Sequence, residues 1–320
     1  MKGHWDFVEN DPIGENFDFE EIEKDVFKNC TLKSPGGHGN RHTYGGLLCS
    51  QSLAAADKTV PSEFNCHSFN CNFILQADSN LPVIYHVKRL FDGRSFATRF
   101  VECFQEDKIK FAAIISYHGP ETHAIEHQSD MPEVPKPADC EDFDTAWAFH
   151  QAWLPVHRRT HYDEMDFNDP DRPRVFQTME MRCADPREFF TTRNRTAKHY
   201  FWVRYKFPLV DDWKTHILTL LYISDNNNNL MVFNAHTRHN NEHFSDGFRP
   251  SMTYSLNHTI YFHGRPFNAN EWMLLELEST NAAHGRGLAR GRIWNEQGEM
   301  IASCSQEVVV RNKESKTSKL

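Results

Sequence analysis

The sequence lacks three features that would assign it at once to a broad class of protein. No apolar run approaches the roughly 20 residues that a membrane-spanning helix needs, so we expect no membrane span. The N-terminal residues 1–20 are acidic and contain no apolar stretch of the kind found in secretory signal peptides. The net charge of −9 provides no contiguous basic surface to follow a phosphate backbone, so we expect no nucleic-acid binding.

Cysteine pairs with metal-binding spacing are also missing. The chain has eight cysteines, but none forms a CxxC pair and nothing resembles a zinc ligand array. We therefore expect no metal, and we expect reduced and mostly buried thiols, as inside cells. Three histidines lie close together at His236, His239 and His243. No carboxylate-supported spacing accompanies them, so a solvated polar loop is the better interpretation.

The sequence does contain enough apolar material for a sizeable core. With 320 residues, of which 39% are hydrophobic and 25 are phenylalanine, the chain is long enough for one large domain or two of ordinary size. We expect most of these phenylalanines in the core, with some available to line a pocket for an apolar ligand.

The last three residues, Ser318, Lys319 and Leu320, form the tripeptide that the peroxisomal import receptor reads. The preceding residues 313–317 are polar, which predicts the accessible tail that such recognition requires. A coincidental charged tail is the weaker alternative, because three specified residues occupy one fixed place. We therefore expect the import receptor as a partner and the peroxisomal matrix as the location.

Two segments of the chain have the same layout. Residues 44–58 predict a helix, because they are rich in alanine, begin with glycines and stop before Pro61. Residues 213–224 have the apolar content and the length of a second helix. The expected strands span residues 67–75, 83–91, 95–105 and 109–118 after the first helix, and 254–262, 271–279, 287–294 and 300–310 after the second.

A helix followed by an antiparallel meander, written twice, predicts an α+β fold in which a sheet wraps each helix. The dipeptides Asp92-Gly93 and Gln297-Gly298 are typical of hairpin turns between these strands. The two sheets are able to pair into one continuous surface. We divide the chain into a first repeat, a linker that crosses the surface, a second repeat and a tail, at residues 1–118, 119–173, 174–312 and 313–320.

Short motifs in both repeats carry a resemblance to a known family. In the first repeat and the linker they are Arg41-His-Thr-Tyr-Gly-Gly46, Gln51-Ser-Leu-Ala-Ala-Ala56, His67-Ser-Phe, Asp92-Gly-Arg-Ser-Phe96, Glu126-His-Gln and Met131-Pro. In the second repeat they are Tyr222-Ile-Ser-Asp225, Ser255-Leu-Asn-His258, Phe262-His263, Arg265-Pro-Phe-Asn268, Glu271-Trp, Glu278-Ser, Arg286-Gly-Leu, Ala302-Ser and Gln306-Glu307. In this order and spacing the chain resembles the acyl-CoA thioesterase II (TesB-like) family, and within it the peroxisomal acyl-CoA thioesterases.

The resemblance implies a double-hotdog fold with one active site per chain, in the second repeat. It implies a catalytic set of an aspartate on the central helix, a serine or threonine on the next strand and a glutamine on the last strand. By motif match these roles fall on Asp225, Ser255 and Gln306. The resemblance also implies an acyl-CoA substrate that is hydrolysed to free fatty acid and CoA, no organic cofactor and no metal. We expect homo-oligomers, since hotdog units often pair between chains.

The implied chemistry suits these residue types. A carboxylate accepts a proton from water, while serine and glutamine orient that water, because each offers both donor and acceptor atoms. Gly45 and Gly46 are our candidates for donating backbone N–H groups to the developing oxyanion. Plainer interpretations exist for all of them: a helix-ending aspartate, ordinary polar strand residues, and glycines that are small for steric reasons.

The sequence departs from the family pattern at three places, one of which is Ser50, where a small glycine before Gln51 is usual. Asn257 stands where relatives often have aspartate, and we expect it to share a strand face with Ser255 and to influence the pKa of Asp225. The residues Asn226–Asn229 follow Asp225 where relatives are more apolar, so we expect a shorter or differently lined acyl pocket.

Two alternatives to an active thioesterase remain. One is a catalytically weak acyl-CoA-binding or assembly protein of the same fold, which only Asn257 and the asparagine run support. The other is a hotdog enoyl-CoA hydratase, which would need a closely placed Asp/His pair that we do not find. Three arginines are possible ligands for the CoA phosphates but stay unassigned, namely Arg265, Arg286 and Arg311.

Overall fold

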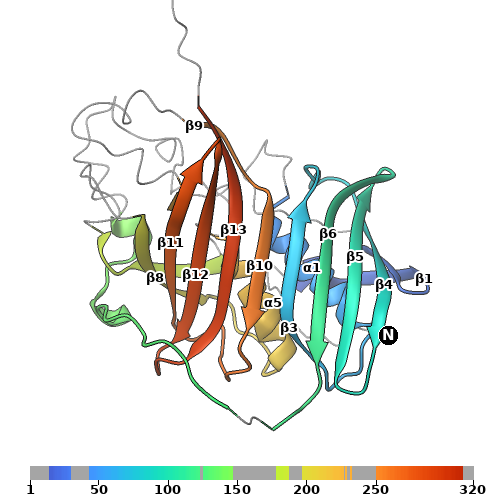
Figure 1. Ribbon diagram of the computed structural model, residues 1–320, viewed down its shortest axis with the longest axis horizontal. Coiled ribbons are helices and arrows are strands. Elements are labelled where there is room, and N and C mark those ends of the chain that lie inside the picture. The colour runs from blue at the N-terminus through green and yellow to red at the C-terminus, as the bar shows by residue number, and fades with distance from the viewer. Residues whose placement is uncertain are drawn as a thin grey trace, which may run out of the picture.

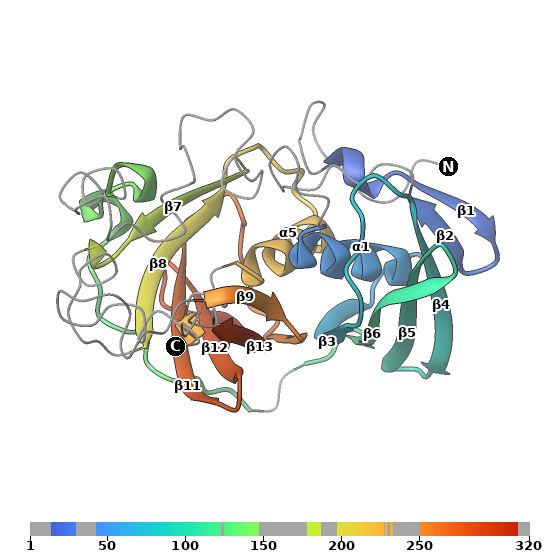
Figure 2. The same cartoon turned by 90° about the horizontal axis from the view of Figure 1, so that it is seen from above.

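The computed structural model describes residues 14–29, 43–122, 125–146, 178–186, 197–226, 228, 231–232 and 250–312. Within these ranges the chain forms one 13-stranded antiparallel sheet with two central helices on one of its faces (Figures 1 and 2). No helix in these ranges has the length and apolar character required to cross a membrane.

Each repeat contributes its elements in the same order: two strands, a helix and a final group of strands, which number four in the first repeat and five in the second. The first repeat contains the short 3-10 helix η1 (Gly14–Phe17), β1 (Phe19–Glu23), β2 (Val26–Asn29), α1 (Gly45–Asp57), β3 (Asn65–Phe73), β4 (Val83–Asp92), β5 (Phe96–Gln105) and β6 (Lys108–His118). After the short 3-10 helix η2 (Pro137–Asp139), the second contains β7 (Met179–Cys183), β8 (Lys198–Tyr205), α5 (Trp213–Ser224), β9 (Pro250–Ser255), β10 (Asn257–Phe262), β11 (Met273–Ala283), β12 (Arg286–Asn295) and β13 (Met300–Asn312). The predicted internal repeat is therefore present.

The two repeats meet in the middle of the sheet. The strand order is β1-β2-β4-β5-β6-β3-β10-β13-β12-β11-β8-β7, with β9 beside the end of β13. At the seam β3 pairs antiparallel with β10, which places Phe69 opposite Ile260. Outward from this seam both halves run through corresponding strands, so the halves are related by a pseudo-twofold axis. The predicted continuous sheet surface is confirmed.

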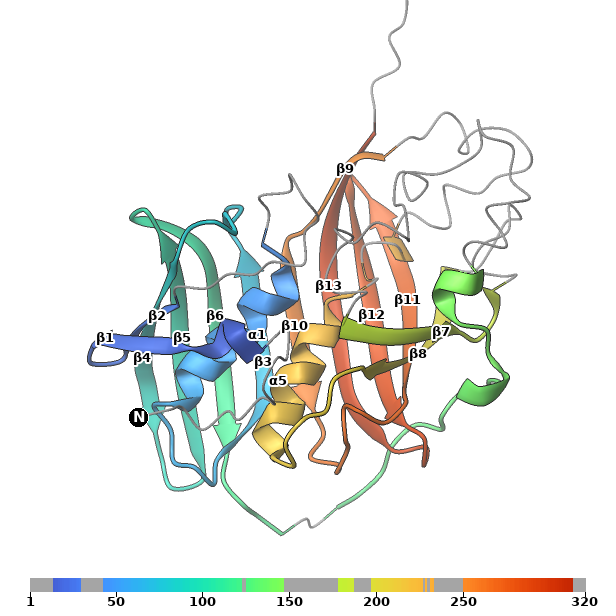
Figure 3. The same ribbon diagram turned by 180° about the vertical axis from the view of Figure 1, so that it is seen from behind.

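The two helices pack against each other under the concave side of the sheet (Figure 3). Every residue of α1 after Gly45 is buried, which explains why this helix has no polar face. Where the helices touch, Ser50 Oγ donates a hydrogen bond of 2.9 Å to the Leu218 carbonyl. Asp212 begins α5 by accepting a hydrogen bond from the Thr215 backbone N–H at 3.0 Å. The helix pair is thus fixed to the centre of the molecule.

The segment predicted as one strand over residues 254–262 is two strands. The chain breaks at Leu256, whose N–H donates to the Glu307 carbonyl at 2.8 Å. Before the break β9 pairs with β13 alone, whereas after it β10 lies between β13 and β3. The strands β1, β2, β7 and β8 were not predicted.

The linker packs over the outer face of the second half of the sheet. Trp202 Nε1 donates to the Pro135 carbonyl at 2.9 Å, and Arg182 donates to the Pro137 carbonyl at 2.8 Å. Residues 143–146, at the end of the described part of the linker, are helical. The polar-loop histidines at 236, 239 and 243 and the C-terminal tripeptide lie outside the described residues.

The described cysteines agree with the expectation of reduced thiols. No disulfide joins the seven cysteines that the structure describes, and all seven are buried. The same part of the chain holds no group of three or more metal-ligating side chains.

Candidate active site

Asp225 lies at the end of α5, where it is the residue that follows the last helical position. Its side chain is buried, with 8% of its surface exposed. Oδ1 accepts a hydrogen bond of 2.9 Å from Gln306 Nε2, and Oδ2 accepts one of 2.9 Å from the backbone N–H of Gly46. The carboxyl group is therefore held by β13 of its own repeat and by the first turn of α1 of the other repeat.

Gln306 connects the three residues that the motif match singled out. Its side chain is fully buried on β13 and faces the helices. The amide nitrogen donates to Asp225 and also to Ser255 Oγ at the end of β9. Both hydrogens of the amide are thus used, and Asp225, Ser255 and Gln306 form one connected cluster. The structure brings these three side chains together, while their catalytic roles stay a prediction.

Burial sets the protonation behaviour of this cluster. Removal from water raises the pKa of Asp225 from its ordinary value of 3.8 to about 7, while the hydrogen bonds from Gln306 and Gly46 act in the opposite direction. A carboxyl group with a pKa near neutrality is suited to accept a proton and to return it within one reaction cycle.

The described titratable side chains around Asp225 do not compete for its proton. Burial raises the pKa of the Tyr44 hydroxyl and of the Cys49 thiol well above their ordinary values, and raises the pKa of Cys304 to about 12. All three stay neutral between pH 5 and 9. Within the described residues, Asp225 is therefore the group that changes charge in the site over this range.

The two glycines at the start of α1 permit the close approach of Asp225. A Cβ atom on Gly45 would lie 2.8 Å from Asp225 Oδ2 and 2.9 Å from the Phe73 ring. On Gly46 it would lie 2.5 Å from the Tyr222 carbonyl oxygen. The Gly46 N–H faces the aspartate of the other repeat here, so an oxyanion-binding role for Gly45 and Gly46 stays a prediction.

The motif match assigns no role to His258, and the structure places this residue in direct contact with the cluster. Its Nδ1 lies 2.9 Å from Gln306 Oε1, and its Nε2 lies 2.9 Å from Ser224 Oγ. The available signal was its position three residues after Ser255 in a family motif, which by itself assigns no role.

The expected influence of Asn257 on Asp225 does not hold. The prediction assumed a continuous strand, and the break at Leu256 separates Asn257 from the face that carries Ser255. Its Oδ1 instead accepts a hydrogen bond of 2.9 Å from the Glu307 backbone N–H. Neither Asn257 nor its neighbours on β10 is among the groups that set the pKa of Asp225.

The asparagine run continues from the end of α5. Asn226 is buried with its amide nitrogen 4.0 Å from Met181 Sδ, and Asn228 Nδ2 donates to the Ser224 carbonyl at 2.6 Å. The Asn228 amide therefore caps the end of α5, whereas the Asn226 amide contacts β7. Asn227 and Asn229 lie outside the described residues, so the expected change in the acyl pocket stays a prediction.

Two of the arginines considered for CoA binding have acidic partners on the protein. Arg265 forms ion pairs with Glu126 and, at 3.8 Å, with Glu299. Arg286 Nε lies 2.8 Å from Glu307 Oε1. Arg311 donates to the Gly285 carbonyl at 3.1 Å. None of these contacts assigns a phosphate ligand.

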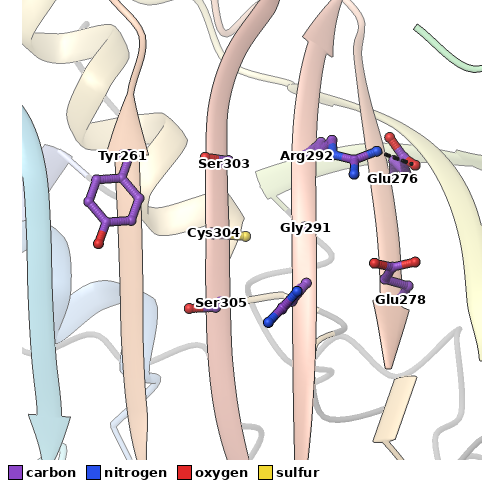
Figure 4. Close-up of a pocket in the computed structure, with 9 residues that line it drawn as sticks. Tyr261, Glu276, Glu278, Gly291, Arg292, Ser303, Cys304 and Ser305 are labelled. Atoms are coloured by element: carbon purple, nitrogen blue, oxygen red, sulfur yellow. Dashed lines mark hydrogen bonds and ion pairs between the residues drawn. The ribbon is translucent and has the colours of Figure 1, made fainter. Parts of the chain in front are cut away.

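A separate depression lies on the opposite, outer face of the sheet (Figure 4). It crosses β10 to β11 and is lined by polar and charged side chains that include Tyr261, Ser303 and Ser305. Within it Arg292 is paired with Glu276 at 3.2 Å. Because Gln306 faces the helices, this depression is not part of the Asp225 cluster.

Two family models match the chain over most of its length. The model of the acyl-CoA thioesterase N-terminal domain matches residues 34–118, and that of the acyl-CoA thioesterase C-terminal domain matches residues 157–310. The chain belongs to the acyl-CoA thioesterase family. The Asp225 cluster lies within the part that matches the C-terminal domain of this family.

Individual thioesterases show the same relationship. Acyl-coenzyme A thioesterase 8 of Rattus norvegicus is 30% identical over 303 residues, which cover 92% of this chain and 87% of that protein. The peroxisomal acyl-coenzyme A thioester hydrolase 1 of Saccharomyces cerevisiae is 25% identical over 307 residues, covering 84% and 86%. The crystal structure of an acyl-CoA thioesterase II from Mycobacterium marinum has a TM-score of 0.71 at 27% identity, covering 94% and 99%. Similarity to solved hotdog structures confirms the double-hotdog α+β fold.

Proposed function

We propose that this protein hydrolyses fatty acyl-CoA esters to free fatty acid and CoA, with Asp225 as the general base. One observation carries the proposal: Gln306 Nε2 donates to both the Asp225 carboxyl and Ser255 Oγ. This arrangement gathers a proton acceptor and two water-orienting groups at one place. Membership of the acyl-CoA thioesterase family supports the choice of substrate class.

The reaction balances with water as the only co-reactant. Asp225 takes a proton from water while the water oxygen attacks the thioester carbonyl carbon, with Ser255 and Gln306 orienting the water. The carbon–sulfur bond then breaks, and the leaving CoA thiolate takes the proton back from Asp225. The carboxylate is restored, and no acyl-enzyme intermediate is needed. The proposed donors to the oxyanion are the backbone N–H of Gly45 and that of Gly46, the latter once it leaves Asp225 Oδ2.

We place this activity in the peroxisome. The support is the C-terminal Ser318-Lys319-Leu320, together with similarity to a yeast relative that is named as a peroxisomal thioester hydrolase. The import receptor is accordingly a proposed partner, and self-association into homo-oligomers is proposed as well.

The test measures release of free CoA thiol from a panel of acyl-CoA esters. Wild type is expected to hydrolyse some esters. The rate of CoA release by Asp225→Asn is expected to be about 10²–10⁴-fold lower. The matched control is Asp57→Asn, because Asp57 is an equally buried aspartate at the end of the other helix. This control is expected to keep wild-type activity.

The outcomes separate the alternatives. Binding of the esters by wild type without release of CoA would favour the binding-protein alternative. Loss of the enoyl absorbance from an enoyl-CoA ester, again without release of CoA, would favour the hydratase. Equal loss of activity in the Asp57 and Asp225 variants would remove Asp225 as the specific base.

A further inference from the structure

A line of buried hydrogen bonds continues beyond the candidate active site. Gln306 Oε1, the acceptor end of the amide, lies 2.9 Å from His258 Nδ1. The other ring nitrogen, Nε2, lies 2.9 Å from Ser224 Oγ on α5. His258, Gln306 and Ser224 are each 1% exposed or less. A polar chain buried to this degree is costly unless all its members are satisfied, so its arrangement is highly specified.

The proton positions in this chain follow from its neighbours. Burial lowers the pKa of His258 to about 4, so the ring is neutral at physiological pH and carries one hydrogen. While Asp225 is ionised its oxygens can only accept, so the Gln306 amide nitrogen faces Asp225 and the amide oxygen faces His258. The ring hydrogen is then on Nδ1, and Nε2 is the acceptor. The Ser224 hydroxyl has one hydrogen and two acceptors at 2.9 Å, namely His258 Nε2 and the Leu221 carbonyl.

We propose that His258 is a positioning residue that fixes the orientation of the Gln306 amide, so that the amide nitrogen faces Asp225 and Ser255. This inference rests on the proposed function. The Nδ1–H of His258 binds the oxygen of the amide, and a reversed amide would direct its N–H hydrogens at that donor. His258 therefore selects one of the two amide orientations that have nearly the same shape.

The need for this residue arises within the reaction cycle. While Asp225 is ionised, its own charge attracts the amide nitrogen of Gln306. Once Asp225 has taken a proton from water, that attraction is lost and a neutral carboxyl group can donate to an amide oxygen. The His258 contact does not depend on this proton, so it preserves the amide orientation through the second half of the cycle.

Among the described groups near His258, Asp225 is the one whose charge changes near neutral pH. His258 faces Ser224 from α5, Gln306 from β13 and, across the seam, Cys71 from β3. Around Asp225 the groups Tyr44, Cys49 and Cys304 stay neutral as described above. Loss of the amide donor on Asp225 is therefore expected to move the titration of Asp225 to higher pH, because that hydrogen bond lowers its pKa.

The test compares two substitutions at one position. His258→Leu removes the donor, and we expect kcat to fall about 100-fold with little change in KM, because His258 is fully buried behind Gln306. We expect the acid limb of the kcat–pH profile to move to higher pH. His258→Asn keeps an N–H near the place of Nδ1 and is expected to recover most of both properties. Ile260→Val, on the same strand and face, is the packing control and is expected to leave kcat within about twofold of wild type.

A measurement without substrate keeps this inference separate from the proposed function. In protein labelled with 15N-histidine, the His258 resonances, assigned by their absence in His258→Asn, are expected to report a neutral ring protonated on Nδ1. The 13C carboxyl shift of Asp225 is expected to titrate at higher pH in His258→Leu than in wild type. A ring protonated on Nε2, an unmoved Asp225 titration, or equal defects in the Leu and Asn variants would overturn the positioning role, whether or not the protein hydrolyses acyl-CoA.

Discussion

Two buried aspartates show how the surroundings give one residue type two different roles. Asp57 is the last residue of α1, and Asp225 is the residue directly after α5, so each is the thirteenth residue counted from the start of its helix. Burial raises the pKa of both carboxyl groups to about 7. Asp225 is held by Gln306 and Gly46. Among the described residues Asp57 Oδ1 has no hydrogen-bond partner, and its neighbour on the last strand of the repeat is Tyr117 instead of a glutamine. Asp225 is connected through Gln306 to Ser255, and both of these side chains can orient water.

The pH dependence of activity should follow the Asp225 carboxyl group. A general base acts only when it is ionised, so we expect kcat/KM to rise with pH through an apparent pKa of about 7 and to level off above it. The neighbouring tyrosine and thiols stay neutral, so a single ionisation should describe the acid limb. Rates of CoA release between pH 5 and 9 measure this. A profile that is flat from pH 5 to 8 would exclude Asp225 as the titrating base.

The Asp57 carboxyl group should reduce stability at neutral and alkaline pH. Its folded pKa of about 7 lies above the unfolded value of 3.8, so the folded state loses stability as pH rises from about 4 to 7. The shift corresponds to a penalty of up to about 4 kcal/mol that is complete above pH 7. Asp57→Asn removes the ionisable group, so we expect it to raise the free energy of unfolding at pH 8 and to change it little at pH 4. Urea denaturation at both pH values measures the difference, and an equal effect at both would contradict the argument.

At the scale of elements, the start of α1 forms part of a site that belongs to the other repeat. The N-terminus of a helix has unpaired N–H groups and a positive end of its dipole, both of which favour a carboxylate. Gly46 directs one such N–H at Asp225 Oδ2, and the absence of side chains on Gly45 and Gly46 lets the helix come close. The position of α1 therefore controls the electrostatics of Asp225.

Gly46→Ala should move the start of α1 away from Asp225 at the end of α5. Its Cβ would lie 2.5 Å from the Tyr222 carbonyl oxygen, so the first turn of α1 must shift. We expect a loss of about 1–3 kcal/mol in the free energy of unfolding and at least a tenfold fall in kcat. Gly264→Ala is the control, because nothing lies within 4 Å of the added Cβ, although the φ of +70° costs some stability. Wild-type kcat in Gly46→Ala, together with the expected loss of stability, would show that the position of α1 does not control Asp225.

Local chemistry makes much of the fold predictable from the sequence, and the remainder depends on packing. The Gln297-Gly298 turn is predictable because Gly298 adopts a φ of +84°, which few other residues tolerate. Strand β1 is not, because its residues after Phe19 are exposed and show no alternation of apolar and polar positions. The break at Leu256 is equally hidden, since β10 is defined by its partners on either side.

The candidate site is predictable to a similar extent. Asp225, Ser255 and Gln306 were found by motif match, and the structure brings them together. The contact of Gly46 with Asp225 joins positions 179 residues apart and depends on how α1 and α5 pack, which no local pattern encodes. The place of His258 in the buried chain depends on its register opposite β13.

The whole molecule is a pair of equivalent halves with unequal chemistry. The strands are arranged symmetrically about the β3–β10 seam, and each half covers one helix. The half that carries Gln306 has the complete cluster, and the other half has Tyr117 at the end of its last strand. The helices nevertheless share one buried interface, in which Ser50 of α1 binds the Leu218 carbonyl of α5. Neither half is independent of the other.

The pseudo-twofold axis has an evolutionary consequence. In a dimer of identical chains every substitution occurs twice, so a change that removes the chemistry from one site removes it from both. Two copies joined in a single chain are encoded separately, so Asp57 and Tyr117 can diverge while Asp225 and Gln306 are retained. Selection then preserves in the first repeat only those residues on which the active site of the second repeat depends. The Gly46 N–H that holds Asp225 is one such requirement.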